Sequence, residues 1–422
     1  RPPRLPAGPG GDDDLRDRSV TTVQHAIDTL EDLRRDWLSA LHAELPDAIA
    51  LRHRLHAQPR LSGDEEDTAA MIEHALGIPM ERLAETGRIG RVGPSEGPSV
   101  LLRAELDALP VTEATGAPYA ATNGAMHACG HDVHQAALVA VVRACRTFSL
   151  PVGLVVLLQP REETYPSGAR DAVQSGALTR YGVAAAAGAH VHPTVPAGTV
   201  ATGAGVVNAA ADEVEILVTG RGGHGAYPHR AADPIAAAAH IVLALPELVR
   251  RTVSPMRPAT VSVGHVQSGQ PSANVLPDQA RILATMRTTD VQDRSDVQDQ
   301  VRRLAASQAE AFGLTSTVTI TAGEPVLYNH PALVERMDDW LVRSGIHVTE
   351  PMRSLGADDF SFFGEVVPAV MSFVGVTVAG HDQAPELHHP RFLPDDDAIL
   401  DVATALVAAY LAGAEIIHLG LT

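Results

Sequence analysis

The hydrophobic and polar positions of the first half of the chain alternate between two periods. Short apolar, β-rich runs predict strands at about 99–102, 152–158 and 184–190. Helical patterns predict helices at about 21–58, 63–76, 134–147 and 169–175. Strands that alternate with helices predict an α/β layer built on a largely parallel sheet.

The pattern changes near Ala211. Strands are predicted at 212–219, 260–267, 281–288 and 315–321, and helices at 234–249 and 291–312. The order β-α-β-β-α-β is that of the split βαβ unit of a ferredoxin-like domain. After about Gly323 the alternation resumes, with a strand at 369–376 and an Ala-rich helix at 396–412.

These patterns predict an α/β protein of two domains, in which a small domain interrupts a larger one. The larger domain covers 21–210 and 323–422, and the inserted α+β domain covers 211–322. A length of 422 residues also favours two cores over one. Residues 1–20 are rich in Pro, Gly and Asp and lack a signal-peptide core, so we expect a disordered extension.

Charge and cysteine content narrow the classes of function. The net charge of −19 repels nucleic acid and anionic membranes, so neither is expected as a partner. No run of 18 apolar residues predicts a membrane span. The two cysteines, Cys129 and Cys145, are too few for a disulfide framework, which favours a reducing compartment, the cytoplasm.

The segment Met126–His134 concentrates groups that bind metals. Thiolate and imidazole are preferred by borderline divalent ions, and Cys129 and His131 can point the same way from extended backbone. Gly130 allows a tight turn between them. The alternative is a surface loop that happens to hold histidines. The roles of His127 and His134 stay open: each could bind metal, form a hydrogen bond or face solvent.

Glu162 and Glu163 follow the predicted strand at 152–158. In open α/β sheets, ligands bind outside the carboxyl ends of strands. Because two adjacent carboxylates cannot easily share one role, we expect one to bind metal and the other to transfer protons. A solvated acidic loop is the alternative.

Two further histidine segments complete the candidate centre. His190 stands at the end of an apolar run, and His192 is less certain. Near the C-terminus, His388 or His389 could coordinate. The candidate ligands are then Cys129, His131, Glu163, His190 and His388. Five ligands are more than one tetrahedral zinc ion needs, and they suit two ions that share a water.

With these motifs in order, the chain resembles the metal-dependent aminoacylase/carboxypeptidase superfamily, metallopeptidase clan MH. It looks like the amidohydrolase branch, which includes hippurate hydrolases, indole-acetyl-amino-acid hydrolases and N-acetyldiaminopimelate deacetylases. The similarity runs from about Leu51 to Ala412. The shared motifs are RHRLHAQPRLSGDE, RAELDALPVTE, MHACGHDVH, QPREE, GAHVHP, GRGGHGAYPH, SANVLPD and LHHP.

The resemblance implies a role for each matching residue. The family's metal ligands match Cys129, His131, Glu163, His190 and His388. Glu162 matches the catalytic acid/base and Asp107 the carboxylate that orients a site residue. His224, Asn274 and Arg287 match substrate-contacting residues of an inserted lid and dimerisation domain, set in a phosphorylase/hydrolase-like fold. In dimeric relatives the lid histidine reaches the neighbouring subunit's site.

One residue and two short stretches depart from the family pattern, and none of these departures removes a proposed ligand. Glu105 stands where Asp is typical, Thr164–Ser167 replaces a Gly-rich run, and Ala357–Phe360 replaces Ser-Glu-Asp-Phe. The Thr164–Ser167 stretch lies beside the expected site and leaves the substrate preference open.

We therefore expect a metal-dependent hydrolase that cleaves the amide bond of N-acyl amino acids, with Glu162 as general acid/base. His224 would help to stabilise the oxyanion, and Asn274 and Arg287 would bind the substrate's carboxylate. Two divalent ions are expected, manganese or zinc, with cobalt and nickel as alternatives. A homodimer or higher homo-oligomer is expected. The alternatives are a dipeptidase or carboxypeptidase on the same scaffold and a non-catalytic metal-binding homologue.

Overall fold

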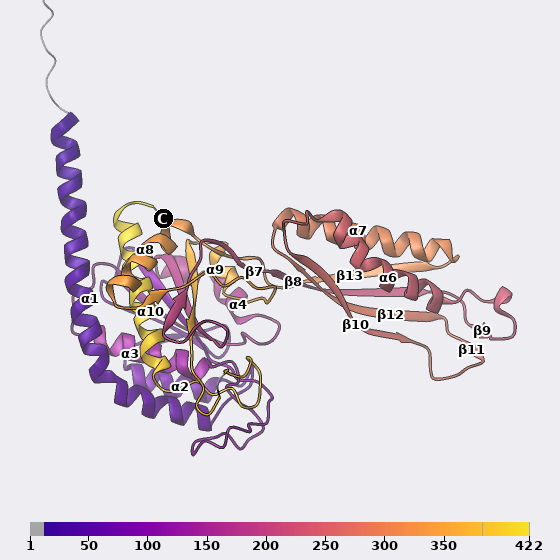
Figure 1. Cartoon of the computed structure of the whole chain (residues 1–422), viewed down its shortest axis with the longest axis horizontal. Coiled ribbons are helices and arrows are strands. Elements are labelled where there is room, and N and C mark those ends of the chain that lie inside the picture. The colour runs from indigo at the N-terminus through magenta and orange to yellow at the C-terminus, as the bar shows by residue number, and fades with distance from the viewer. Residues whose placement is uncertain (1–11, 382, 422) are drawn as a thin grey trace, which may run out of the picture. The chain divides into compact units, whose positions relative to one another are not determined.

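The computed structural model describes residues 12–381 and 383–421, with side chains described from residue 27 onward. The chain forms two compact units (Figure 1). Unit 1 contains the chain up to Ala204, Asn329–Met352 and the residues from Phe363 onward. Unit 2 contains Gly205–Tyr328 and Arg353–Phe362. The sequence pattern carried no indication of the second segment of unit 2.

Unit 1 is built on a mixed sheet of eight strands. Their order across the sheet is β1 (Met80–Leu83), β2 (Gly87–Val92), β4 (Gly153–Gln159), β3 (Ser99–Glu105), β5 (Val183–His192), β16 (Ala369–Gly375), β6 (Thr199–Ala201) and β15 (His347–Val348). The central strands β4, β3, β5 and β16 are parallel, whereas β2 joins β4 and β6 joins β16 in antiparallel pairs. The expected α/β class with a mixed sheet is thereby confirmed.

Every residue of β3, β4 and β16 is buried, as expected for strands covered on both faces. The helices of unit 1 are α1 (Asp12–Ala57), α2 (Glu66–Leu76), α3 (His131–Cys145), α4 (Gly168–Gln174), α5 (Ala177–Arg180), α8 (Pro331–Arg343) and α10 (Ala398–His418). The short helix α9 (Ser361–Gly364) spans the change from unit 2 to unit 1 along the chain.

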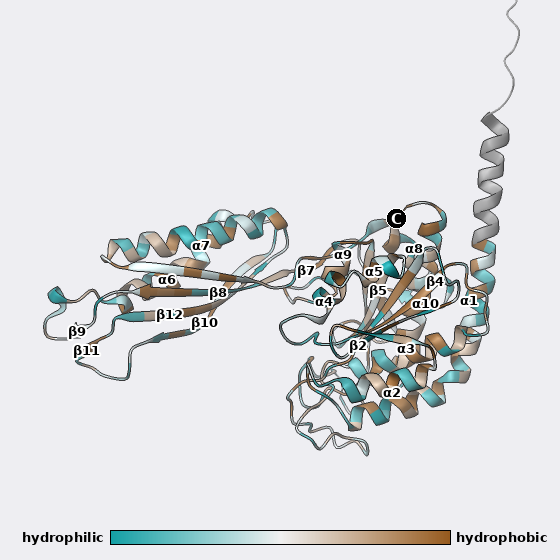
Figure 2. Ribbon diagram, turned by 180° about the vertical axis from the view of Figure 1, so that it is seen from behind, coloured by the Kyte–Doolittle hydropathy of each residue, from teal (hydrophilic) through white to brown (hydrophobic). Residues whose placement is uncertain are grey.

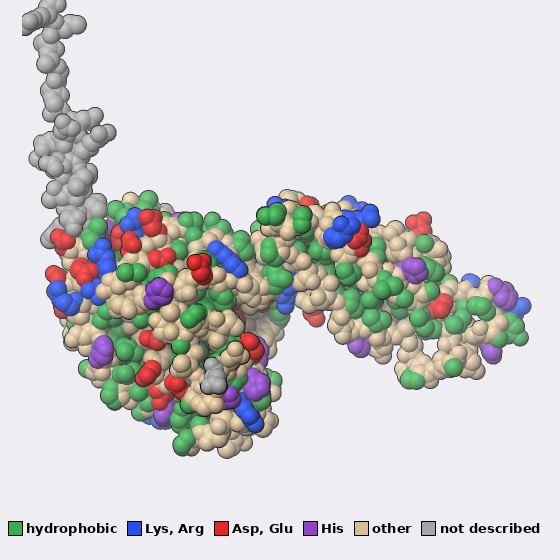
Figure 3. All heavy atoms as spheres, viewed as in Figure 1, with side chains coloured by type: hydrophobic (Ala, Val, Ile, Leu, Met, Phe, Trp, Pro, Cys, Tyr) green, Lys and Arg blue, Asp and Glu red, His purple; other side chains and the backbone are tan. Residues whose placement is uncertain are grey.

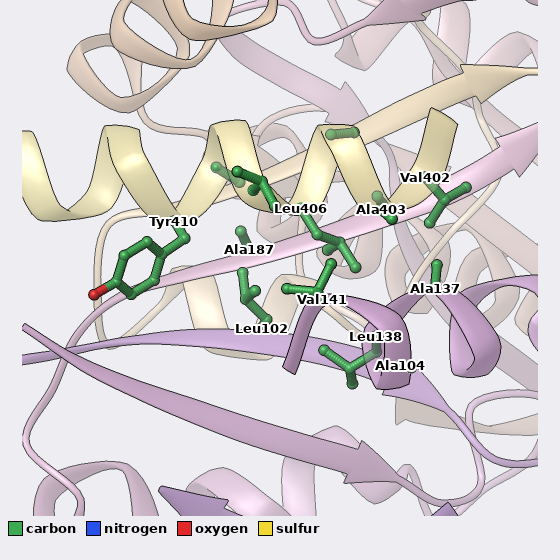
Figure 4. Close-up of a cluster of buried hydrophobic side chains, with 14 of the residues drawn as sticks. Leu102, Ala104, Ala137, Leu138, Val141, Ala187, Val402, Ala403, Leu406 and Tyr410 are labelled. Carbon is green, nitrogen blue, oxygen red and sulfur yellow. The ribbon is translucent and has the colours of Figure 1, made fainter. Parts of the chain in front are cut away.

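Helix α10 forms the centre of the unit 1 core. It is long and apolar enough to cross a membrane by composition, but 89% of its apolar window is buried inside the structure. Figure 4 shows Leu406 and Ala403 facing Ala187 of β5 and Val141 of α3. Tyr410 donates a hydrogen bond to the Val152 carbonyl at 2.7 Å. The apolar composition of α10 is therefore explained by its contacts within the core.

Helix α1 starts earlier than the sequence pattern predicts. Residues 1–11 of the predicted disordered extension lie outside the described residues, and α1 begins at Asp12. The structure thus includes residues 12–20 of the expected extension in α1. The physical reason is that 12–20 contains neither Gly nor Pro, which are confined to 1–11, so no helix breaker separates it from the helix that follows.

Unit 2 holds a four-stranded antiparallel sheet in the order β10 (Ala259–Ser268), β12 (Gln279–Thr288), β8 (Ala210–Thr219) and β13 (Thr315–Ala322). The helices are α6 (Pro234–Thr252), α7 (Val291–Ala311) and the 3-10 turn η1 (Pro228–Arg230). Two small sheets pair β11 (Val275–Leu276) with β9 (Gly223–His224) and β14 (Leu327–Asn329) with β7 (Gly205–Asn208).

The apolar positions of α7 explain how it covers the sheet of unit 2. Val297, Val301, Ala305 and Ala309 recur every fourth residue and are fully buried. The remaining positions of α7 are largely hydrophilic (Figure 2). Acidic and basic side chains are both spread over the visible face of each unit (Figure 3).

Gly413 gives a test of the packing of α10 against β3. A Cβ at this position would lie 2.6 Å from Val100 Cγ2, so Gly413→Ala must displace the β3 side chain. Helix propensity alone would favour alanine by about 1 kcal/mol. Overpacking costs about 1–3 kcal/mol, so we expect a net loss in the free energy of unfolding. Urea titration measures it, with Gly264→Ala as control, because a Cβ there meets nothing within 4 Å. An unchanged or raised stability of Gly413→Ala would contradict the packing.

Candidate metal centre

The predicted ligands of unit 1 lie at one edge of its sheet. Strands β3, β4 and β5 are parallel neighbours, so their carboxyl ends meet at the same edge. Asp107 follows β3, Glu162 and Glu163 follow β4, and His190 lies near the end of β5. His131 is the first residue of α3, directly after the turn that holds Cys129.

Cys129, Glu163 and His388 form the first cluster of possible ligands. One ligand atom of each lies within 4.8 Å of the other two. His388 Nε2 is 3.4 Å from Glu163 Oε1, and Cys129 Sγ is 3.5 Å from His190 Nε2. His388 has a positive φ of 66°, an unusual backbone conformation that often occurs at functional sites. Side chains from four separate segments thus approach one another.

The second cluster contains His131, Glu162 and Glu163, again with ligand atoms within 4.8 Å of one another. His131 Nε2 lies 3.8 Å from Glu162 Oε2. Since Glu163 belongs to both clusters, the five predicted ligands and Glu162 form one connected group. The residues of both clusters would hold the divalent cations that this set of donors suits.

Hydrogen bonds set the ring nitrogen that each buried histidine presents. His131 Nδ1 is 2.9 Å from the Asp107 carbonyl, and His190 Nδ1 is 2.7 Å from the Val191 carbonyl. Because a carbonyl only accepts, each Nδ1 carries a proton, and in the neutral ring Nε2 then has the free lone pair. His131 Nε2 makes no hydrogen bond within the described part of the chain, although it is buried. Both rings therefore present the nitrogen that a metal would use.

Asp107 connects these loops. Its Oδ2 accepts the Glu163 N–H at 3.0 Å and the Ser62 hydroxyl at 2.7 Å, and its Oδ1 lies 3.8 Å from His131 Nδ1. Asp107 Oδ1 and Glu163 Oε1 are buried and make no hydrogen bond among the described residues. Buried oxygens of this kind are normally satisfied, so the orphaned atoms fit a site for cations or ordered water.

The electrostatics of the cluster favour a bound cation. Burial raises the pKa of the Cys129 thiol well above its usual range, and the nearby carboxylates Glu163 and Glu162 raise it further. Burial also lowers the pKa of His190, which keeps that ring neutral. For Glu163, burial opposes ionisation, but His388 and His131 hold its pKa below the ordinary value. A divalent ion would supply the positive charge that a thiolate ligand needs.

His134 lies against the same cluster but has both ring nitrogens engaged. Its Nδ1 is 2.9 Å from Glu105 Oε2, and its Nε2 accepts the Val191 N–H at 2.9 Å. His192 Nδ1 accepts the hydroxyl of Thr194 at 2.9 Å. Hydrogen bonding therefore accounts for His134, one of the roles that the sequence pattern left open. The sequence interpretation missed that Glu105 is its partner.

A second buried network lies behind the first turn of α3. Arg52 Nε and His56 Nδ1 each lie 3.0 Å from Asp132 Oδ2, and His56 Nε2 lies 3.2 Å from Glu113 Oε1. Arg52 and Asp132 are buried side chains. The RHRLH motif carries Arg52 and His56, but only the fold reveals that it ties α1 to the residue next to His131.

The predicted substrate-contacting residues lie in unit 2. His224 of β9 is exposed, and its Nδ1 accepts the Ala226 N–H at 3.0 Å. The Asn274 carbonyl accepts the Gly225 N–H at 2.8 Å, which places Asn274 beside His224. Arg287 lies near the end of β12 and donates to Thr285 Oγ1 at 2.5 Å. The structure thus brings His224 and Asn274 together within unit 2.

The His56 network predicts a pH dependence of stability. Burial disfavours the charged ring, but Asp132 and Glu113 raise the pKa of His56 to about 9. An unfolded histidine titrates near 6.5, so this stabilisation is complete below about pH 6.5 and is lost as the pH rises through about 9. Between these limits, the free energy of unfolding should fall by about 2–3 kcal/mol more for the parent chain than for His56→Gln.

Urea titrations of chelator-treated protein at each pH measure this difference. His42→Gln, an exposed histidine of the same helix, is the control and should keep the parent's pH profile. Parallel profiles for His56→Gln and the parent would contradict a charged, paired His56.

Comparisons with known proteins find a matching family and several relatives. The model of peptidase family M20/M25/M40 matches residues 101–412. An N-acetyl-L-cysteine deacetylase of Bacillus subtilis is 36% identical over 371 residues, 86% of this chain and 86% of the relative. An N-acetyldiaminopimelate deacetylase of Bacillus cytotoxicus is 31% identical over 359 residues, 83% of this chain and 94% of the relative.

A solved structure is similar over almost the same span. The Bacillus subtilis protein YXEP, a dinuclear metal-binding peptidase of family M20, has a TM-score of 0.75 and 30% identity, covering 90% of this chain and 100% of that one. The resemblance inferred from the motifs is therefore confirmed, and the chain belongs to peptidase family M20/M25/M40, within its amidohydrolase branch.

Proposed function

We propose that this protein is a metal-dependent amidohydrolase that cleaves the amide bond of N-acyl amino acids. The observation that carries the proposal is the convergence of Cys129, His131, Glu163, His190 and His388 with Glu162 at one sheet edge. The deacetylase relatives supply the substrate class, a small amino acid with an acyl group on its nitrogen.

The ligand set suits two divalent ions. Thiolate and imidazole donors favour zinc, and carboxylate with imidazole also suits manganese, with cobalt or nickel as further candidates. Such ions, when bound, polarise a scissile carbonyl and lower the pKa of a water. The orphaned atoms His131 Nε2 and Glu163 Oε1 support the assignment.

Glu162 is the proposed acid/base. Its side chain is 12% exposed, and its Oε2 lies 3.8 Å from His131 Nε2 in the cluster. Its carboxylate takes a proton from the attacking water and returns it to the departing amine nitrogen. Asp107 holds the Glu163 N–H, and its backbone carbonyl holds His131, so it orients two of the ligands.

Unit 2 is proposed to be a ferredoxin-like lid and dimerisation domain. The order β8-α6-β10-β12-α7-β13 and the antiparallel strand order β10-β12-β8-β13 support this class of fold. His224 is proposed to stabilise the oxyanion, and Asn274 and Arg287 to bind the substrate's carboxylate. A homodimer in the cytoplasm is the assembly and location that we propose.

The first test concerns Glu162. Glu162→Gln removes the base but keeps a side chain of the same size, so two ions per chain should stay bound. Loss of a general base typically lowers turnover by about 10²–10⁴-fold. Hydrolysis of N-acetyl-L-cysteine, N-acyl aromatic amino acids and dipeptides is measured, with the exposed Glu365→Gln as control. Near-parental turnover of Glu162→Gln would reject the role, and a preference for dipeptides would favour a peptidase.

The second test concerns the metals. Chelation should abolish hydrolysis, and manganese, zinc, cobalt or nickel should restore it. Elemental analysis should find two ions per chain in the parent and fewer in Cys129→Ala, whereas Cys145→Ala should keep both ions. Cys145 is the matched control, since it is also a buried thiol but bonds the Val142 carbonyl. Full metal content in Cys129→Ala would remove the thiol from the ligand set.

A further inference from the structure

Glu65 is a fully buried carboxylate at the start of α2 that does not cap its own helix. It occupies the N-cap position, yet its side chain makes no capping hydrogen bond. Its Oε1 accepts the Arg161 N–H at 2.9 Å, and its Oε2 accepts the Thr86 hydroxyl at 2.7 Å. The short side chains of Ser, Thr, Asp and Asn commonly bond the first turn of their own helix from this position, whereas the Glu65 carboxylate bonds two other segments of the fold.

The partner of Glu65 is a residue in an unfavourable backbone conformation. Arg161 has φ 51°, in the left-handed region that residues other than glycine rarely adopt. Such a conformation persists when the surroundings hold it. The Arg161 guanidinium pairs with Glu85 at 2.6 Å and with Asp171, and its carbonyl accepts the Gly168 N–H at 3.1 Å. The next residue along the chain is the proposed base, Glu162.

Close packing fixes the start of the same turn. A Cβ added to Gly87 would lie 2.7 Å from Pro160 Cδ, and one added to Gly168 would lie 1.7 Å from the Pro160 carbonyl oxygen. After the base, the Glu163 N–H is held by Asp107 at 3.0 Å. Buried carboxylates from two other segments therefore hold the backbone N–H groups on either side of Glu162.

This backbone shape has a consequence for the side chains. In a regular strand, successive side chains point to opposite faces. Glu162 and Glu163 nevertheless both bring a carboxylate oxygen within 4.8 Å of a His131 nitrogen. β4 ends at Gln159, and residues 162–166 form bends directly after the left-handed Arg161, so the alternation of the strand does not continue into the two glutamates.

We propose that Glu65 is a positioning residue for the reaction: it holds the Arg161 N–H so that Glu162 is aimed at the site while Glu163 remains a ligand. The proposal rests on the proposed function of Glu162. Glu65 acts through the backbone and does not touch the substrate.

Two substitutions of Glu65 distinguish this positioning role from a contribution to stability alone. Glu65→Ala removes both hydrogen bonds, whereas Glu65→Gln loses the charge but keeps an oxygen for the Arg161 N–H and an amide for the Thr86 hydroxyl. Glu66→Ala is the matched control, because it removes the adjacent carboxylate of the same helix, which pairs with Arg82 and Arg88.

Misplacement of a catalytic group by about 1 Å can cost about 10²-fold in rate, so we expect kcat of Glu65→Ala to fall by about 10–100-fold. KM should stay within about threefold and metal content should not change, because the ligands remain. Glu65→Gln and Glu66→Ala should retain kcat within about threefold of the parent. Parental kcat in Glu65→Ala, or an equal loss in Glu65→Gln, would overturn the proposal.

Amide hydrogen exchange over residues 159–164 tests the contact between Glu65 and Arg161 without relying on the hydrolysis assay. The Arg161 N–H should exchange at least about tenfold faster in Glu65→Ala than in the parent, and Glu65→Gln should retain protection. If the parent hydrolyses no N-acyl amino acid, the proposed function fails while this exchange difference still reports on the contact. Unchanged exchange in a folded Glu65→Ala would reject the contact itself. If Glu65→Ala does not fold, Thr86→Val, which removes the second partner of Glu65, should show the same changes to a smaller extent.

Discussion

Carboxylates, imidazoles and a thiol crowd together at the carboxyl edge of β3, β4 and β5, where burial makes unbalanced charge unfavourable. The pKa shifts follow from this burial of charged groups. The pKa of the Cys129 thiol is raised, so the thiol resists ionisation, whereas His388 and His131 lower the pKa of Glu163 and keep it ionised. Bound divalent cations would balance the charge of these groups. The surrounding hydrogen bonds orient the groups for such ions.

Those hydrogen bonds come from elements far apart in the chain. Asp107 holds the Glu163 backbone, its carbonyl sets the tautomer of His131, and Glu105 engages His134. Farther out, Asp132 joins α3 to Arg52 of α1. The parallel sheet makes this possible, because it delivers several loops to one edge while the apolar core, with α10 at its centre, keeps the strands rigid. The proposed metal centre and the packing of unit 1 therefore share residues.

Several features were predictable because they are local. The apolar runs located β3, β4, β5 and β16, the change of pattern after Ala211 located the strands and helices of unit 2, and motif order indicated the family. Composition is a weaker guide than apolar periodicity. The composition of 1–20 favours a disordered extension, whereas the structure describes 12–20, which lacks the Gly and Pro that interrupt helices, as part of α1.

By itself, the sequence determined which residue types were available for metal chemistry and at the ends of which strands they would stand, since spacing and apolar periodicity are properties of the chain. Only the tertiary structure decided which nitrogen His131 presents, that His134 is engaged by Glu105 and Val191, and that Glu65 reaches Arg161. The reason is physical: a hydrogen bond between residues 96 positions apart depends on the packing of α2 against the strands, which no local pattern encodes.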